Sequence, residues 1–338
     1  MANMISVLNT ILANASSEYQ SRVPAATRDN LSEVGSAIMG FNATENEFLS
    51  ALVNKVAMTI VRNKTFKNPL SVLKKGGVPL GQNIEEIYTN PVSGTIYDPT
   101  GADLLKREIP DTKAIYHTMN RQGKYKATVS KAQLLQAFKS YRDLENLLNS
   151  IVNAIYSGDN MDEFILMKNL FSSAISGGKL KTVEVAEITN TETARNFVKD
   201  VKKAGKAMTM PTTAFNAYAD INVGEKPVVT WTPTDDQILI IRNDISVDVD
   251  VEMFAQAFNV DYAKFNTRCL EVDSFGAGAD NCYAILCDKA FVQVYDNLSQ
   301  MESFYNGEGL YTNYIHHHWQ TYSLSLFANA VAFCHPTT

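Results

Sequence analysis

The stretch AIYHTMNRQGKYKATVSKAQLLQAFKSYRDLENLLNSIVNAIYS (114–157) joins short strand-like runs to one long helical pattern. The strand-like runs flank a turn that we predict at residues 121–123. Ser130 and Gln133 then form a capping box, which predicts the start of a helix. Apolar side chains follow at helical spacing, at Leu134, Leu135, Phe138, Tyr141, Leu144, Leu147, Leu148, Ile151, Val152 and Ile155.

The length of this helix restricts the shape of the protein. A helix of about 28 residues is about 42 Å long, because each residue adds about 1.5 Å. A helix of that length crosses a whole subunit, which favours an extended subunit lying across its neighbours over a compact globule with a catalytic pocket. An ordinary core helix beside a surface hairpin is the alternative.

A polar segment precedes the helix. Residues 66–129 include the run FKNPLSVLKKGGVPLGQNIEEIYTN (66–90), which Pro and Gly interrupt repeatedly. Its apolar residues are too sparse to build a core, and a two-stranded ribbon is marginally stable in water unless something covers it. We therefore expect an extended loop with a β-hairpin that packs on another surface.

The rest of the chain alternates between helical and strand-like patterns. We expect the long helix to end at Ser157-Gly158-Asp159 and a second helix, capped by Asn160 and Glu163, to run to residues 177–178. The run QILIIR (237–242) is nearly all apolar, which predicts a strand buried on both faces. Helices and strands alternate over residues 180–297, which indicates a mixed lobe.

Several runs of sequence resemble a known family. They are NPLSVLKKGGVPLGQNIEEIYT (68–89), MNRQGKY (119–125), IVNAIYS (151–157), VDVEMFAQAFNV (249–260) and VYDNLSQMESFYNGEGLYTNYIHHHWQTYSLSLFANAVAF (294–333). The chain resembles the major capsid protein of tailed bacteriophages, which has the Hong Kong 97-type fold. At residue level it is most similar to the major head protein of small podoviruses that prime their DNA with a protein.

This resemblance implies an α+β capsid fold with a defined order of parts. They are an N-terminal arm (1–43), a helix leading into the loop (44–65), the extended loop (66–129), the spine helix and peripheral domain (130–179), the axial domain (180–297) and strands that return to the peripheral domain (298–338). The chain ends at Thr338, where the best-known relative continues into an immunoglobulin-like domain. We expect no function of that domain here.

The resemblance also implies a structural function. The expected protein is not an enzyme; it self-associates into pentamers and hexamers that form an icosahedral or elongated phage head around double-stranded DNA. Expected partners are a separate scaffolding protein and a portal protein, with assembly in the host cytoplasm and no membrane contact. A shell protein of an encapsulin-like bacterial nanocompartment and a cytosolic α/β enzyme are the alternatives.

Composition agrees with a protein that stays in the cytosol. The 338 residues carry a formal net charge of −6, which argues against sequence-independent nucleic-acid binding but not against enclosing nucleic acid. No stretch of about 18 uncharged apolar residues exists to span a membrane. The four cysteines lack C-x-x-C spacing, so we expect them to be reduced and mostly buried.

Charge is unevenly distributed along the chain. Residues 48–84 contain no acid, whereas residues 225–273 contain ten acids and four bases. Two solvated surfaces would explain this pattern, but we predict that the positively charged base of the extended loop meets an acidic surface of an adjacent subunit. The candidate contact residues are Lys64, Lys67, Lys74, Lys75, Arg121, Asp235, Asp236 and Asp248.

No reactive constellation emerges from the residues. His316 and His318 lie on one face of a predicted strand and His317 on the other, so at most two of them share an ion. No carboxylate or cysteine stands at a convincing partner spacing. The acids around Asp250 are explained by helix capping. We therefore predict no catalytic residue, no cofactor and no metal site.

Overall fold

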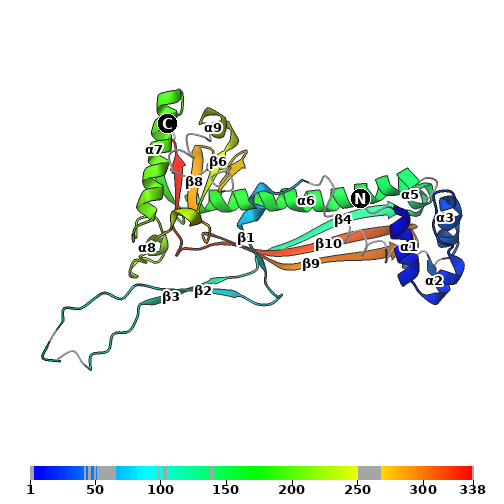
Figure 1. Cartoon of the computed structure of the whole chain (residues 1–338), viewed down its shortest axis with the longest axis horizontal. Helices are drawn as coiled ribbons and strands as arrows, with labels where there is room; N and C mark the ends of the chain where they lie inside the picture. The colour runs from blue at the N-terminus through cyan, green and yellow to red at the C-terminus, as the bar shows by residue number, and fades with distance from the viewer. Residues whose placement is uncertain are drawn as a thin grey trace. The chain divides into compact units, whose positions relative to one another are not determined.

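A computed structural model describes residues 4–41, 43–44, 47–48, 51, 66–97, 99–101, 105–137, 141–249 and 268–336 (Figure 1). The chain forms two compact units. Unit 1 comprises Met1–Asn68, Arg121–Glu163 and Asp296–Gln320, and unit 2 comprises Pro69–Asn120, Phe164–Tyr295 and Thr321–Thr338. The predicted helices over most of residues 44–65 and around residues 250–258 lie outside the described residues.

The N-terminal part of unit 1 is a cluster of short helices. These are α1 (Met4–Asn14), α2 (Ser17–Arg22) and α3 (Leu31–Met39). The side chain of Ser16 caps α2 by accepting a hydrogen bond from the Tyr19 amide, which satisfies an otherwise unpaired donor. The helices bury Ile11, Tyr19 and Ile38 in one apolar cluster with Leu134 of helix α5 (Lys131–Ala137).

The predicted capping box at Ser130 is confirmed, because Gln133 N–H donates to the Ser130 hydroxyl and the Gln133 side chain accepts from Ser130 N–H. The predicted helix end at residues 157–159 is wrong. Helix α6 runs from Tyr141 to Ser176 without a break. Gly158 lies within it, and a side chain there would meet the Tyr125 ring at 3.6 Å. That is an ordinary van der Waals contact, so Gly158 is a regular helical position next to Tyr125 and not a helix stop.

A four-stranded sheet has the strand order β1-β9-β10-β4. Its members are β1 (Lys74–Gly77), β4 (Arg121–Ser130), β9 (Val292–Asn306) and β10 (Tyr311–Leu324). Strand β4 pairs antiparallel with β10, with Arg121 opposite Gln320 and Ser130 opposite Tyr311. The predicted turn at residues 121–123 is therefore wrong: these residues begin a strand, and Gly123 brings its backbone close to the His318 carbonyl.

Unit 2 contains a mixed five-stranded sheet in the order β5-β11-β8-β6-β7. The strands are β5 (Lys181–Glu184), β6 (Gln237–Arg242), β7 (Cys269–Val272), β8 (Cys282–Asp288) and β11 (Ala330–Cys334). The 237–242 strand is confirmed: Leu239 and Ile241 point to one apolar cluster and Ile240 to the other.

Helices cover both faces of this sheet. Helix α7 (Thr191–Met208) places Phe197 and Val201 on one face, and the C-terminal part of α6 places Met167 and Phe171 on the other. The short helices α8 (Tyr218–Ile221) and α9 (Asn243–Asp248) and the 3-10 turns η1 (Pro69–Leu73) and η2 (Thr234–Asp236) complete the unit.

The extended loop contains a separate two-stranded hairpin. Strand β2 (Ile84–Thr89) pairs antiparallel with β3 (Thr112–His117), and Figure 1 shows a long loop between them. The side chains of both strands alternate between exposed and partly buried positions. Because the hairpin has only two strands, it depends on contacts with other segments for its stability.

The cysteine prediction is wrong for one pair. Cys282 of β8 and Cys334 of β11 face each other across neighbouring strands and form a disulfide, whereas Cys269 and Cys287 are free. The pairing was hidden because 52 positions separate the two cysteines. Among the described residues, no helix is both long and apolar enough to cross a bilayer.

Candidate contact surfaces and a buried charge cluster

The loop between β2 and β3 exposes large apolar side chains. Ile96 is 95% exposed and Leu105 is 91% exposed, and Tyr97 and Ile109 are nearly as open. Single exposed apolar residues are ordinary on a protein surface, but a whole loop of them without a core is typical of a surface that a partner covers. The loop is thus the strongest contact surface among the described residues.

The base of this hairpin is held firmly within unit 2. The Tyr88 hydroxyl donates to the Val229 carbonyl at 2.5 Å, and the Tyr88 ring stacks on Phe327 at 5.6 Å. The Asn90 side chain donates to Asp111 and accepts from the Val229 amide, so it ties both ends of the hairpin to one segment. A fixed base with an apolar tip can present the tip in a constant direction.

The charged contact candidates lie in different settings. Lys67 is exposed, Lys74 is half-buried at the start of β1, and Lys64 lies outside the described residues. Asp235 is almost fully exposed, at 3.8 Å from Arg268, and Asp248 is the last residue of α9. Neither their exposure nor their position tests the predicted contact between subunits.

Two candidates from opposite charge groups, Lys75 and Asp236, both contact Lys289 of the same unit. The Lys75 ammonium donates to the Lys289 carbonyl at 2.5 Å, and the Lys289 ammonium lies 2.5 Å from Asp236. Burial lowers the pKa of Lys75, and nearby Asp288 opposes this shift. Part of the positively charged base of the extended loop is therefore already next to acidic groups of its own chain.

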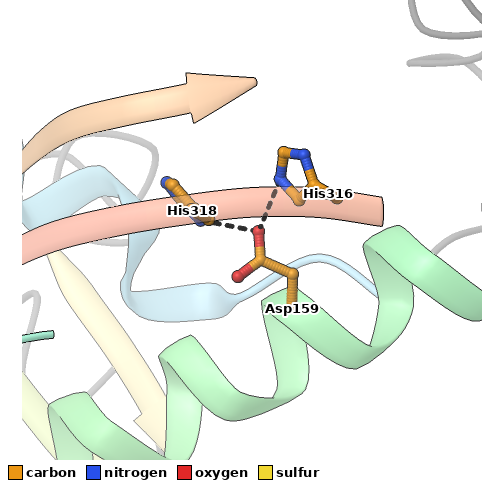
Figure 2. Close-up of side chains that lie close together, drawn as sticks. All are labelled: Asp159, His316 and His318. Atoms are coloured by element: carbon orange, nitrogen blue, oxygen red, sulfur yellow. Dashed lines mark hydrogen bonds and ion pairs between the residues drawn. The ribbon is translucent and has the colours of Figure 1, made fainter. Parts of the chain in front are cut away.

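A cluster of buried ionisable side chains occupies unit 1. Figure 2 shows Asp159 of α6 beneath His316 and His318 of β10, with both rings directed at the same carboxylate oxygen. His318 Nδ1 lies 2.6 Å from Asp159 Oδ2, and His316 Nε2 lies 3.4 Å from it. All three residues are buried.

Further polar groups surround these three. Arg121 of β4 donates to Asp159 Oδ1 at 3.1 Å, and Asp296 of β9 lies 3.0 Å from His318 Nε2. The Gln320 amide donates to Asp296 at 2.7 Å and to Glu163 of α6 at 2.8 Å. Side chains from α6, β4, β9 and β10 thus share one hydrogen-bond network.

The network changes the proton affinity of its members. Burial alone would raise the pKa of Asp159, but its contacts with His316 and His318 and the charge of Arg121 hold it well below its ordinary value. Burial would lower the pKa of His318, but hydrogen bonds to Asp159 and Asp296 outweigh it and raise that pKa to about 9. His318 therefore carries a positive charge at neutral pH when no other cation is present.

Two of the three residues of this cluster, His316 and His318, were predicted from sequence to share one face of a strand. The alternation of His316, His317 and His318 is confirmed, since the first and third are buried and the second is partly exposed. Asp159 was not predicted as the third member, because it lies 159 positions from His318 along the chain. Asp159 was assigned to a helix break at residues 157–159. A continuous helix would have placed Asp159 and Glu163 on one face.

Comparison with protein families identifies the chain. The model of the family described as Phi29-like phage major capsid protein matches residues 8–334. The chain belongs to this family.

Relatives agree with this assignment. The chain is 36% identical over 332 residues to the major capsid protein of Bacillus phage B103 and 37% identical over 330 residues to that of Bacillus phage PZA. Each alignment covers 97% of this chain and 72% of the relative. The major capsid protein of Streptococcus phage Cp-1 is 31% identical, with 96% of this chain and 92% of the relative covered.

Solved structures share the fold. A chain of the Staphylococcus phage Andhra capsid superposes with a TM-score of 0.67 at 15% identity, covering 82% of this chain and 87% of that chain. A chain of the mature bacteriophage PhiM1 capsid gives a TM-score of 0.51 at 10% identity, covering 82% and 88%. The α+β fold is the Hong Kong 97-type capsid fold, and this protein is a phage major capsid protein, which decides against the nanocompartment alternative.

Proposed function

We propose that this capsid protein forms pentamers and hexamers that build an icosahedral or elongated head around double-stranded DNA. The observation that carries the proposal is the β2–β3 loop, whose exposed Ile96, Tyr97 and Leu105 need a covering surface. A neighbouring subunit supplies that surface, and the fixed base of the hairpin sets the direction of the contact. Many such modest contacts add up to a stable shell.

Other partners follow from the same proposal. A separate scaffolding protein guides assembly in the host cytoplasm, and a portal protein occupies one vertex. The net charge of −6 favours an inner wall that does not hold the phosphate backbone tightly. Charge pairs between Lys67 or Lys74 and the exposed Asp235 of a neighbour add orientation to the contact.

Negative-stain microscopy of the purified full chain, with and without the scaffolding protein from its genome, tests this function. We expect closed shells or sheets of capsomers. A variant with Ile96→Ser, Tyr97→Ser and Leu105→Ser should remain a folded subunit that no longer assembles, because the substitutions remove only exposed apolar surface. Val223→Ser, which changes an 89% exposed residue outside the loop, is the matched control.

Two results would contradict the proposal. Small uniform particles of the wild-type chain under both conditions would argue against a shell. Normal shells from the triple loop variant would show that the loop does not carry the contact. Reversing charge at Lys67 and Lys74 should shift the salt concentration needed for assembly, and an unchanged salt dependence would remove the electrostatic part alone.

A further inference from the structure

His316 is a buried histidine with few hydrogen-bonding contacts. Its Nδ1 has no hydrogen-bond partner, and its Nε2 lies 3.4 Å from Asp159, which is long for a hydrogen bond. The Nε2 atom faces the Asp159 carboxylate without a short hydrogen bond, so it is the atom that an ion would bind. We propose that Asp159, His316 and His318 bind one divalent first-row transition-metal ion, for which Zn²⁺ is the suitable probe.

The donor atoms have the spacing that such an ion requires. Asp159, His316 and His318 each offer one ligand atom, and these atoms lie within 4.8 Å of one another. His316 Nε2 and His318 Nδ1 both face Asp159 Oδ2. Ligands about 2.0–2.1 Å from zinc in a tetrahedral site are about 3.3 Å apart. The 3.4 Å separation between His316 and Asp159 already fits, and the 2.6 Å separation between His318 and Asp159 must open slightly.

The outer hydrogen bonds match those of a metal site. Histidine ligands usually donate their second N–H to a carboxylate, and carboxylate ligands usually accept a further hydrogen bond. His318 Nε2 faces Asp296, and Asp159 Oδ1 accepts from Arg121. These contacts occupy His318 Nε2 and Asp159 Oδ1, and Figure 2 shows both histidine rings facing the other oxygen, Asp159 Oδ2.

The charge of the cluster favours a cation. Asp159, Glu163 and Asp296 contribute three carboxylates, while Arg121 is the fixed positive charge that contacts Asp159. A divalent ion offsets both of the remaining negative charges. Both histidines bind the ion as neutral imidazoles.

The chemistry of the ligand set selects the kind of ion. Two imidazole nitrogens and one carboxylate oxygen suit zinc and its first-row neighbours, whereas Mg²⁺ and Ca²⁺ prefer oxygen ligands throughout. Three protein ligands leave a fourth position for water. The bound ion would join α6 to β10 within unit 1, so its role is to stabilise that unit.

The test compares two neighbouring histidines of one strand. His316→Phe removes a ligand but keeps a ring beside Tyr156, which lies 5.1 Å away; His317→Phe makes the same change on the opposite face. Untagged full chain is stripped with EDTA, dialysed against Zn²⁺ and analysed for metal per chain by mass spectrometry. Calorimetric titration with Zn²⁺ gives the affinity, and circular dichroism confirms that each variant is folded.

We expect one zinc per chain in the wild type and in His317→Phe, with at least 100-fold weaker binding in His316→Phe. Zinc should also raise the unfolding temperature of the wild type and of His317→Phe but not of His316→Phe. If His316→Phe does not fold, Asp159→Asn replaces it. Equal zinc binding by a folded ligand variant, or no zinc bound by the wild type, overturns the proposal.

Discussion

Helix α6 uses one buried stripe in two chemically different ways. In unit 1 the stripe carries Asp159 and Glu163, which hydrogen-bond to strands β4 and β10. In unit 2 the same stripe continues with Met167, Phe171 and Ala174, which belong to the apolar core beneath the five-stranded sheet. The spacing of three or four residues is unchanged, so only the side-chain chemistry differs.

The two halves contribute differently to stability. Apolar burial is favourable at almost any orientation, whereas buried charges repay their desolvation only when each group has its partners in place. We infer that the apolar half supplies most of the folding energy and that the polar half fixes the position of α6 against the strands of unit 1. Four substitutions or treatments test this difference.

The largest loss is expected in the apolar half. Phe171 is fully buried and meets Phe275 edge to face at a centroid distance of 6.4 Å. Phe171→Ala should lower the free energy of unfolding by about 3–5 kcal/mol, since it removes apolar contacts and leaves a cavity. Urea unfolding of the unassembled chain measures the loss. Ile165→Ala, at an exposed position of the same helix, should change it by no more than about 0.5 kcal/mol.

The disulfide between Cys282 and Cys334 should strengthen the same apolar core. Closing a loop of 52 positions restricts the unfolded chain, and such bonds typically add about 2–4 kcal/mol. We expect a thiol reagent to titrate two thiols in the denatured protein and four after reduction, and the reduced protein to unfold at lower urea. In the native state Cys269 and Cys287 should react slowly, because burial raises the pKa of each to about 12. Four reactive thiols before reduction would contradict the pairing.

An intermediate loss is expected in the polar half. Glu163 accepts from Asn68 at 2.7 Å and from Gln320 at 2.8 Å. In Glu163→Gln the new amide group must face one of these donors, and Gln320 cannot turn over easily because it also contacts Arg121 and Asp296. The free energy of unfolding should fall by about 1–3 kcal/mol.

Urea unfolding in EDTA measures the effect of Glu163→Gln without interference from metal ions. Glu308→Gln, at an exposed position in the same unit, is the matched control. A loss as large as that of Phe171→Ala would show that the polar half carries as much of the folding energy as the apolar half. No loss at all would show that the network does not depend on the Glu163 charge.

The local parts of this comparison were predictable from sequence. The capping box at Ser130, the 237–242 strand and the shared face of His316 and His318 follow from short-range periodicity, and all three are confirmed. Each depends on residues within a few positions of one another. The family resemblance rested on runs spread over most of the chain. It is confirmed as well, since the family model matches residues 8–334.

The errors have a common physical origin. Gly158 and the strand start at Arg121 were both interpreted as breaks because glycine usually marks a turn. Instead, Gly158 lies inside helix α6, and Gly123 allows β4 to approach the His318 carbonyl of β10, which is distant in sequence. Asp159 and the Cys282–Cys334 pair depend on tertiary contacts that periodicity does not encode. The charged contact candidates remain predictions, since a single chain does not contain its neighbours.

The smallest effect is expected where an ion pair borders the apolar half of α6. Lys168 Nζ contacts both oxygens of Asp273, at 2.7 and 2.9 Å, but the Asp273 side chain is 61% exposed. Burial would raise the pKa of Asp273, and the Lys168 contact outweighs it and lowers that pKa below its ordinary 3.8. Because solvent screens exposed pairs, Asp273→Asn should cost less than about 1 kcal/mol at pH 7.

The lowered pKa of Asp273 determines how the effect of Asp273→Asn changes with pH. A carboxyl whose folded pKa is lowered contributes stability above its unfolded pKa and loses that contribution as pH falls through the folded pKa. The stability difference between wild type and Asp273→Asn should therefore be constant from pH 7 to about pH 5 and shrink below about pH 4. Asp200→Asn, at an exposed position of α7, should show no such change. A difference that persists unchanged at pH 3 would mean that Asp273 acts through packing or neutral hydrogen bonds and not through its charge.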